Sequence, residues 1–136
     1  TGVGNFRDIE VEDLTKHKTD SEEMEITQEA CDIINTAKNE RNKIFAVGTT
    51  TLKALETCVN IKGQVNPFKG WTNKFIFAPY DFTVADAMVS NFHTPGSTQL
   101  MMVAAFGGYN MVMDAYKIAR DEGYRFGTYG DAMLIL

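Results

Sequence analysis

The sequence predicts an α/β domain of layered βαβ type with a mixed sheet, because apolar runs alternate with stretches of helical periodicity. Residues 43–48 form a short apolar run that is rich in β-formers and ends at a glycine, as in a buried parallel strand. Residues 30–37 place apolar side chains on one helical face. With a short strand at residues 22–26, these elements predict a βαβ unit with a right-handed crossover.

The later elements follow from apolar runs and turn residues. A second helix is expected at 52–59, a long loop or irregular hairpin at 60–74, and strands at 75–77, 82–84 and 88–89. Thr27 and Ser97 are suitable N-caps, and the unbroken apolar run 100–106 predicts a buried helix. The last helix is expected to be capped by Asn110 and to stop at Gly123, before a final strand at 133–136.

The length predicts that residues 1–136 form a single α/β domain. The 136 residues are 44% hydrophobic and 23% charged, which is ordinary for a globular protein. Two cysteines exclude a disulfide scaffold, and no apolar run reaches the length of a membrane span. We recognise no signal peptide, so a cytoplasmic protein without membrane contact is expected.

The charge is unevenly distributed along the chain. The net charge of −5 argues against strong nonspecific binding to nucleic acid. Residues 41–80, however, hold six basic residues and one acidic residue, which leaves an anionic partner open. The alternative is a row of solvated lysines along one edge of the molecule.

Three segments could carry chemistry. The first is Gly48-Thr49-Thr50-Thr51, where a glycine after a strand would present N–H groups and hydroxyls at a helix start. Such a junction favours an anion or a polar ligand beyond the carboxyl end of the strand. A plain threonine cap is the alternative.

The second segment is residues 91–98, where Asn91, His93 and Ser97 flank a proline turn. A histidine there can move protons near neutral pH, or it can simply be satisfied by backbone carbonyls. Ser97 lacks the glycine elbow of a serine nucleophile.

The third segment, residues 124–131, mixes Arg125, Phe126, Tyr129 and Asp131 with glycines. Aromatic faces can stack on a base and arginine can bind phosphate, whereas an Arg–Asp pair in an aromatic turn is the alternative. The histidines and cysteines lie too far apart in sequence to predict a metal site.

Six motifs in collinear order together resemble one family. They are Gly4-Asn5-Phe6-Arg7, Val47 to Thr51 with Leu55-Glu56, Gly70-Trp71-Thr72, Asn91-Phe92-His93 with Pro95 and Ser97-Thr98, Ala105-Phe106, and Tyr124 to Met133. The chain resembles the C-terminal part of the S-adenosylmethionine:tRNA ribosyltransferase-isomerases of queuosine biosynthesis. One departure is Lys53, where the family commonly has arginine, so the charge is kept but the planar bidentate group is lost.

The resemblance implies a larger enzyme in which an α/β domain carries an inserted β-barrel that this chain lacks. Such an enzyme transfers the ribosyl group of S-adenosylmethionine to 7-aminomethyl-7-deazaguanine at the wobble position of tRNA, giving epoxyqueuosine. S-adenosylmethionine is then a substrate, and no metal is expected. On this reading the fragment alone would be inactive, and its unpaired strand edges could let it self-associate.

The resemblance also suggests roles for individual residues. His93 is expected to act as acid and base, with Asp131 or Glu56 orienting a cation or the ribose. Substrate binding is expected from Thr49, Thr50, Thr51, Lys53, Asn91, Arg125, Phe126 and Tyr129. The alternative is a non-catalytic nucleotide-binding or RNA-binding module, which would bind its ligand without turnover.

Overall fold

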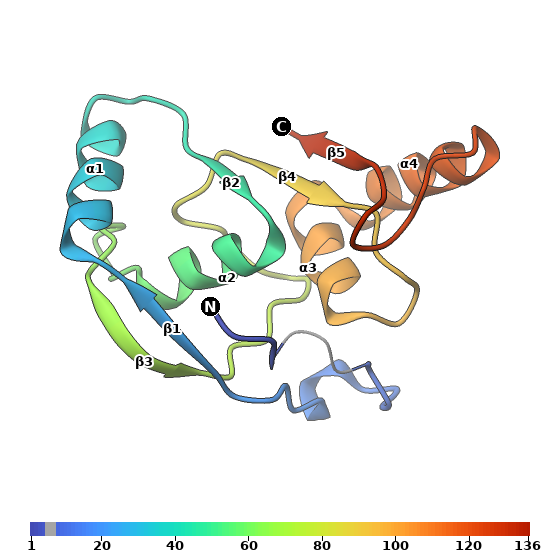
Figure 1. Ribbon diagram of the computed structural model, residues 1–136, viewed down its shortest axis with the longest axis horizontal. Helices are drawn as coiled ribbons and strands as arrows, with labels where there is room; N and C mark the ends of the chain where they lie inside the picture. The colour runs from blue at the N-terminus through green and yellow to red at the C-terminus, as the bar shows by residue number, and fades with distance from the viewer. Residues whose placement is uncertain (5–7) are drawn as a thin grey trace.

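Two β-sheets and four α-helices make up the part of the chain, residues 1–4 and 8–136, that the computed structural model describes (Figure 1). The larger sheet is mixed, as expected: its order is β2-β4-β5, with β2 parallel and β5 antiparallel to β4. A separate antiparallel ribbon pairs β1 with β3. The strands are β1 (Glu22–Ile26), β2 (Phe45–Val47), β3 (Phe68–Thr72), β4 (Ala87–Asn91) and β5 (Ala132–Ile135).

The helices begin and end largely where local chemistry predicts. They are α1 (Gln28–Asn39), α2 (Thr49–Cys58), α3 (Thr98–Gly107) and α4 (Tyr109–Asp121), with a short 3-10 helix η2 (Leu14–Lys16). The Thr27 hydroxyl accepts the Ala30 N–H and the Ser97 hydroxyl accepts the Leu100 N–H, so both predicted caps are confirmed. The cap predicted at Asn110 is wrong, because α4 begins at Tyr109 directly after Gly108.

The predicted βαβ unit is wrong in its strand pairing. β1 lies in the ribbon with β3, whereas β2 pairs with β4, so the parallel crossover runs from β2 through α2 to β4. The strands predicted at 75–77 and 82–84 are also absent, although Ile76 is fully buried. Apolar content showed that these segments enter the core, but it could not show whether a partner strand lies beside them.

In the described part of the chain, the two faces of the mixed sheet differ in burial. Ala46, Met88 and Ile135 are buried on one face. On the other face Phe45, Val47 and Leu134 are 52%, 66% and 55% exposed, and Val89 joins Val47 and Leu134 in one row across the three strands. The result is a bare apolar surface of the kind that interaction partners often cover. Among the described residues, no helix is both long and apolar enough to cross a membrane.

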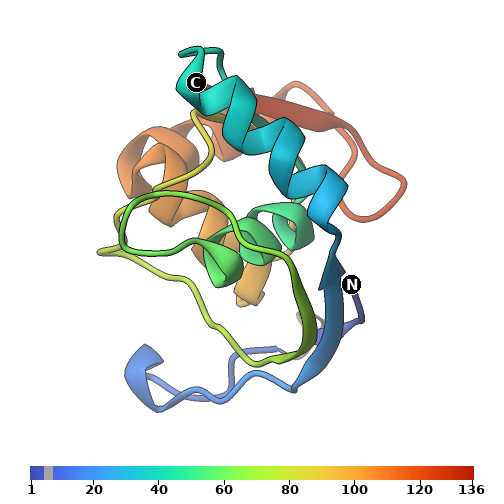
Figure 2. The same ribbon diagram turned by 90° about the vertical axis from the view of Figure 1, so that its left-hand side faces the viewer.

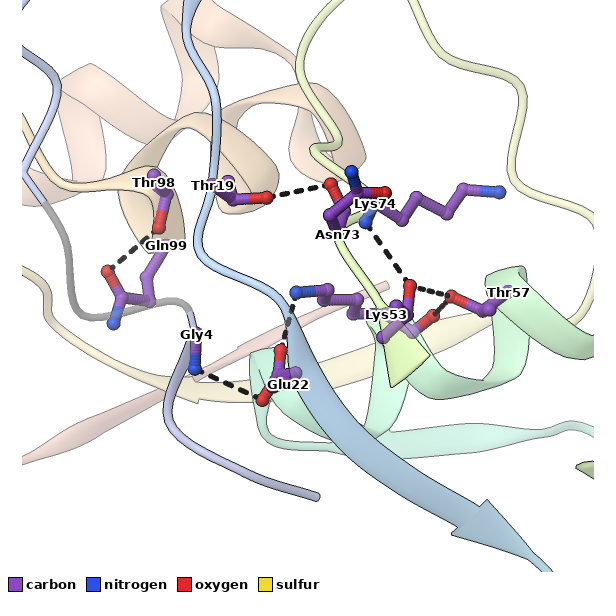
Figure 3. Close-up of polar contacts among 10 residues, drawn as sticks. Gly4, Thr19, Glu22, Lys53, Thr57, Asn73, Lys74, Thr98 and Gln99 are labelled. Atoms are coloured by element: carbon purple, nitrogen blue, oxygen red, sulfur yellow. Dashed lines mark hydrogen bonds and ion pairs between the residues drawn. The ribbon is translucent and has the colours of Figure 1, made fainter. Parts of the chain in front are cut away.

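A buried ion pair ties the ribbon to α2, which lies between the two sheets (Figures 1 and 2). Lys53 Nζ donates to Glu22 Oε1, and both side chains are 2% exposed. The Gly4 N–H donates to the other oxygen of Glu22 at 3.3 Å (Figure 3). A Cβ at Gly4 would lie 2.4 Å from the Asp20 carbonyl oxygen, so this position requires glycine. The rest of the Gly4-Asn5-Phe6-Arg7 motif lies outside the described residues.

We expect Lys53→Met to lower the free energy of unfolding by about 3–5 kcal/mol, because it leaves the Glu22 carboxylate buried without its cation. The double variant Glu22→Gln/Lys53→Met removes both charges and should recover much of that loss. Urea unfolding of both variants checks this expectation. Equal losses in the single and double variants would contradict it.

Candidate active site

A polar pocket of about 360 Å³ opens at the carboxyl ends of β2 and β4, where α2 and α3 begin. All three candidate segments of the sequence reach it. Its lining residues are Asp8, Gly48, Thr49, Thr50, Ser90, Asn91, His93, Thr94, Ser97, Gln99, Gly127 and Thr128. Within the described part of the chain, no group of three or more histidine, cysteine or acidic side chains could hold a metal ion.

The first side of the pocket is the turn from β2 into α2. Gly48 adopts a φ of 93°, which favours glycine, and its N–H donates to the Val89 carbonyl of the neighbouring strand at 2.8 Å. Among the described residues no side chain caps α2, so N–H groups of its first turn can meet a ligand. Thr49 is buried and Thr50 half-buried at this turn, whereas the exposed Thr51 does not line the pocket.

His93 stands where β4 leaves the sheet and is held from two sides. Its Nε2 lies 2.8 Å from the Ser90 hydroxyl, and its backbone N–H donates to the Tyr116 hydroxyl at 3.0 Å. Burial lowers the pKa of His93 below its ordinary value of 6.5, so the imidazole is neutral at pH 7. A neutral imidazole can accept a proton, which is what a general base requires.

The Ser90 hydroxyl is coupled to the tautomer of that imidazole. This hydroxyl also donates to the Asn91 carbonyl at 3.1 Å, and a hydroxyl has a single hydrogen to give. When that hydrogen goes to Asn91, Nε2 of His93 carries the ring proton and Nδ1 is the free base. Sequence reasoning missed Ser90, although its spacing of three residues from His93 is a signal that it could have used.

The third segment reaches the pocket through its glycine turn. The Gly127 N–H donates to the Phe92 carbonyl at 2.8 Å, which brings Gly127 and Thr128 to the rim. The predicted site residues Arg125 and Asp131 lie outside the pocket, where the Asp131 carboxylate accepts the Arg125 N–H at 2.7 Å and the guanidinium at 3.5 Å. These bonds lower the pKa of Asp131, and they fit the alternative of an Arg–Asp pair in a turn.

The two aromatic residues of this segment differ in environment. Phe126 packs on Phe92 and Tyr116, with ring centroids 5.2 and 5.7 Å apart. Tyr129 is 96% exposed and is not among the described residues that line the pocket. Neither side chain therefore lines the polar pocket.

Glu56 and Lys53, both predicted as site residues, are buried away from the pocket on α2. One Glu56 carboxylate oxygen accepts the N–H groups of Thr83 and Val84 at 3.0 Å each. The other accepts the hydroxyls of Thr83 at 3.0 Å and Tyr80 at 3.2 Å. In this structure Glu56 anchors the segment before β4, and Lys53 pairs with Glu22, so both side chains hold the fold.

The sequence comparisons agree with this arrangement of motifs. A family model described as "Queuosine biosynthesis protein" matches residues 1–135. The chain belongs to that family. It is 67% identical over 135 residues to an S-adenosylmethionine:tRNA ribosyltransferase-isomerase of Bacteroides fragilis and 61% identical over 136 residues to one of Parabacteroides distasonis. The expected family is therefore confirmed.

The chain spans only part of these relatives. The two alignments cover 99% and 100% of this chain, but 38% and 39% of the relatives. A crystal structure of an S-adenosylmethionine tRNA ribosyltransferase from Thermotoga maritima is 44% identical, with a TM-score of 0.77. That match covers 82% of this chain and 39% of the other, so the described fold corresponds to one part of a longer polypeptide in these proteins.

We expect Glu56→Ala to lower the free energy of unfolding by about 3 kcal/mol, because it leaves the buried N–H groups of Thr83 and Val84 without an acceptor. Asp114→Ala on the exposed side of α4 is the matched control and should change stability by less than about 0.5 kcal/mol. Urea unfolding measures both. Similar values for the two variants would contradict the anchoring role.

We expect stability to fall as the pH drops below the ordinary histidine value of 6.5, because His93 has a lower pKa in the folded state than in the unfolded state. Protonation then favours unfolding, at up to about 1.4 kcal/mol per pH unit. His93→Gln should remove this component. Urea unfolding at several pH values between about 5.5 and 7.5 measures it, and identical pH profiles in both proteins would contradict the assignment.

Proposed function

We propose that this chain forms the His93 site of an enzyme that transfers the ribosyl group of S-adenosylmethionine to 7-aminomethyl-7-deazaguanine at the wobble position of tRNA and isomerises it to an epoxy-cyclopentane. The products would be epoxyqueuosine-tRNA, adenine and methionine. One observation carries the proposal. In a chain of this family, three segments far apart in sequence meet in one pocket around a neutral, partly buried histidine.

The reaction needs several proton transfers that one imidazole could serve. The amine of the modified base must be neutral to act as a nucleophile, and a proton must leave C5′ beside the sulfonium. Adenine departs more easily when it is protonated. His93, neutral at pH 7 and fixed by Ser90, has the protonation state needed to take the first proton and to give it back later.

The pocket also offers groups for binding the ribosyl donor. N–H groups and hydroxyls at Thr49 and Thr50 suit a methionine carboxylate or ribose hydroxyls, and Asn91 offers a further polar group. S-adenosylmethionine would be a substrate here, and the proposal requires no metal. A tRNA partner would place the protein in the cytoplasm.

The remaining predicted site residues are assigned by position. Thr51, Arg125 and Tyr129 are exposed near the pocket segments and remain candidates for contacts with RNA. Lys53, Glu56 and Asp131 would act at a distance, by holding α2 and the last turn in place.

We expect a protein of the relatives' length that contains this chain to release adenine from S-adenosylmethionine when it is given a tRNA anticodon stem-loop with the aminomethyl-deazaguanine. His93→Ala should slow that release by about 10²-fold or more, the usual contribution of a general acid–base. Chromatographic measurement of adenine follows the reaction. Lys62→Ala in an exposed loop is the control and should keep the unmodified rate.

Two outcomes would contradict the proposal. Wild-type turnover in a folded His93→Ala protein would remove the acid–base role. Binding of nucleotide or RNA without adenine release by the folded wild type would favour a non-catalytic binding module.

A further inference from the structure

A second cavity, of about 400 Å³, lies on the other side of His93. Its walls are apolar and aromatic, with Leu100 from α3, Met113 and Tyr116 from α4, and Phe126 from the turn before β5. Among the described residues, His93 is the one that lines both this apolar cavity and the polar pocket. His93 therefore lies at the boundary between two spaces of different character.

The described linings of the two spaces also differ in charge. The described lining of the polar pocket includes Asp8 and no lysine or arginine. The apolar cavity is instead lined by Lys117 and Arg120, which lie on α4, with no acidic residue in its described lining. Arg120 binds the neighbouring Asp121 at 2.8 Å on the surface, a weak exposed pair that an incoming phosphate can replace.

These contrasts match the charges of the two substrates in the proposed function. S-adenosylmethionine carries a sulfonium and an ammonium against one carboxylate, so its net charge is positive. A nucleotide of RNA combines a flat, largely apolar base with an anionic phosphate. Aromatic side chains stack on bases, and lysine and arginine bind phosphate.

We propose that the two substrates occupy separate cavities, with S-adenosylmethionine in the polar pocket and a nucleotide of the RNA in the apolar cavity. The base would lie against Phe126 and Tyr116, with its phosphate at Lys117 and Arg120. This assignment rests on the proposed function and deepens it. It places His93 between the amine of one substrate and the ribosyl group of the other.

Residues of the apolar cavity wall help to hold His93 in position. Tyr116, part of that wall, accepts the His93 backbone N–H at 3.0 Å, and Ser90 on the polar side holds Nε2 at 2.8 Å. Phe92, next in the chain, packs on Phe126 with ring centroids 5.2 Å apart. A base resting on Phe126 would therefore share a rigid support with the imidazole.

The test measures binding of each substrate separately, in a protein of the relatives' length that contains this chain. Fluorescence anisotropy follows the labelled anticodon stem-loop, and calorimetry follows S-adenosylmethionine. Lys117→Ala/Arg120→Ala should weaken RNA binding by about tenfold or more and lower the salt dependence by roughly one unit of log–log slope per cation removed. Its affinity for S-adenosylmethionine should change less than about twofold, since that pocket is untouched.

Asp8→Asn provides the opposite variant. It should weaken S-adenosylmethionine binding several-fold and leave RNA binding unchanged. Lys62→Ala is the matched surface control for the loss of a lysine charge. It also tests whether the basic segment 41–80 contributes to RNA binding.

The outcomes separate this inference from the proposed function. If the wild type releases adenine but the α4 variant binds RNA normally, or loses affinity for S-adenosylmethionine instead, the division of the cavities is wrong and the function stands. An equal loss of RNA binding in Lys62→Ala would likewise overturn the assignment, because it would indicate general electrostatic attraction. If the folded wild type binds neither substrate, both proposals fail.

Discussion

β4 pairs on one side with β2 and on the other with β5, and the directions of these pairings decide where the pocket lies. β2 is parallel to β4, so the carboxyl ends of the two strands lie side by side, and Gly48 and His93 follow them at the same edge of the sheet. The antiparallel partner runs the other way, so the residues before β5 arrive at this edge as well. Three segments far apart in the sequence are thereby brought to one place, and the bonds from Gly48 to Val89 and from Gly127 to Phe92 fix their register there.

The first turn of α2 faces the pocket, and the helix itself is held in place by buried charged side chains. Seven of its ten residues are buried, including Lys53 and Glu56. A helix enclosed in this way must pair its charged groups internally, because an unpaired buried charge costs several kcal/mol. Lys53 binds β1 and Glu56 binds the segment before β4, so the two charges fix α2 against separate parts of the chain. The orientation of its first turn toward the ligand space depends on both anchors.

Local features of this fold could be predicted from the sequence, whereas pairing between distant segments could not. The caps at Thr27 and Ser97 and the turn at Gly48 depend on neighbouring residues, which the sequence displays directly. The strand that pairs with β1 lies more than forty residues away along the chain. The alternation of apolar and polar residues within β1 does not indicate which strand that is. The same limit applies to Lys53 and Glu56. A charged residue next to a ligand motif looks functional in sequence, and only the positions of Glu22 and Thr83 show that both charges are used inside the fold.

The histidine at the centre of the site combines features that are usually in conflict. Partial burial keeps the imidazole neutral, and therefore basic in form, but it also limits the access of water that would exchange protons with it. The Ser90 hydroxyl offers a partial substitute, because it can either donate to Nε2 or accept from it, depending on whether Asn91 takes its hydrogen. Rotation of the Ser90 hydroxyl would then change which ring nitrogen of His93 carries the proton, while the ring itself stays in place. In a reaction that first removes and later returns a proton, such a pair would let one fixed imidazole serve both steps.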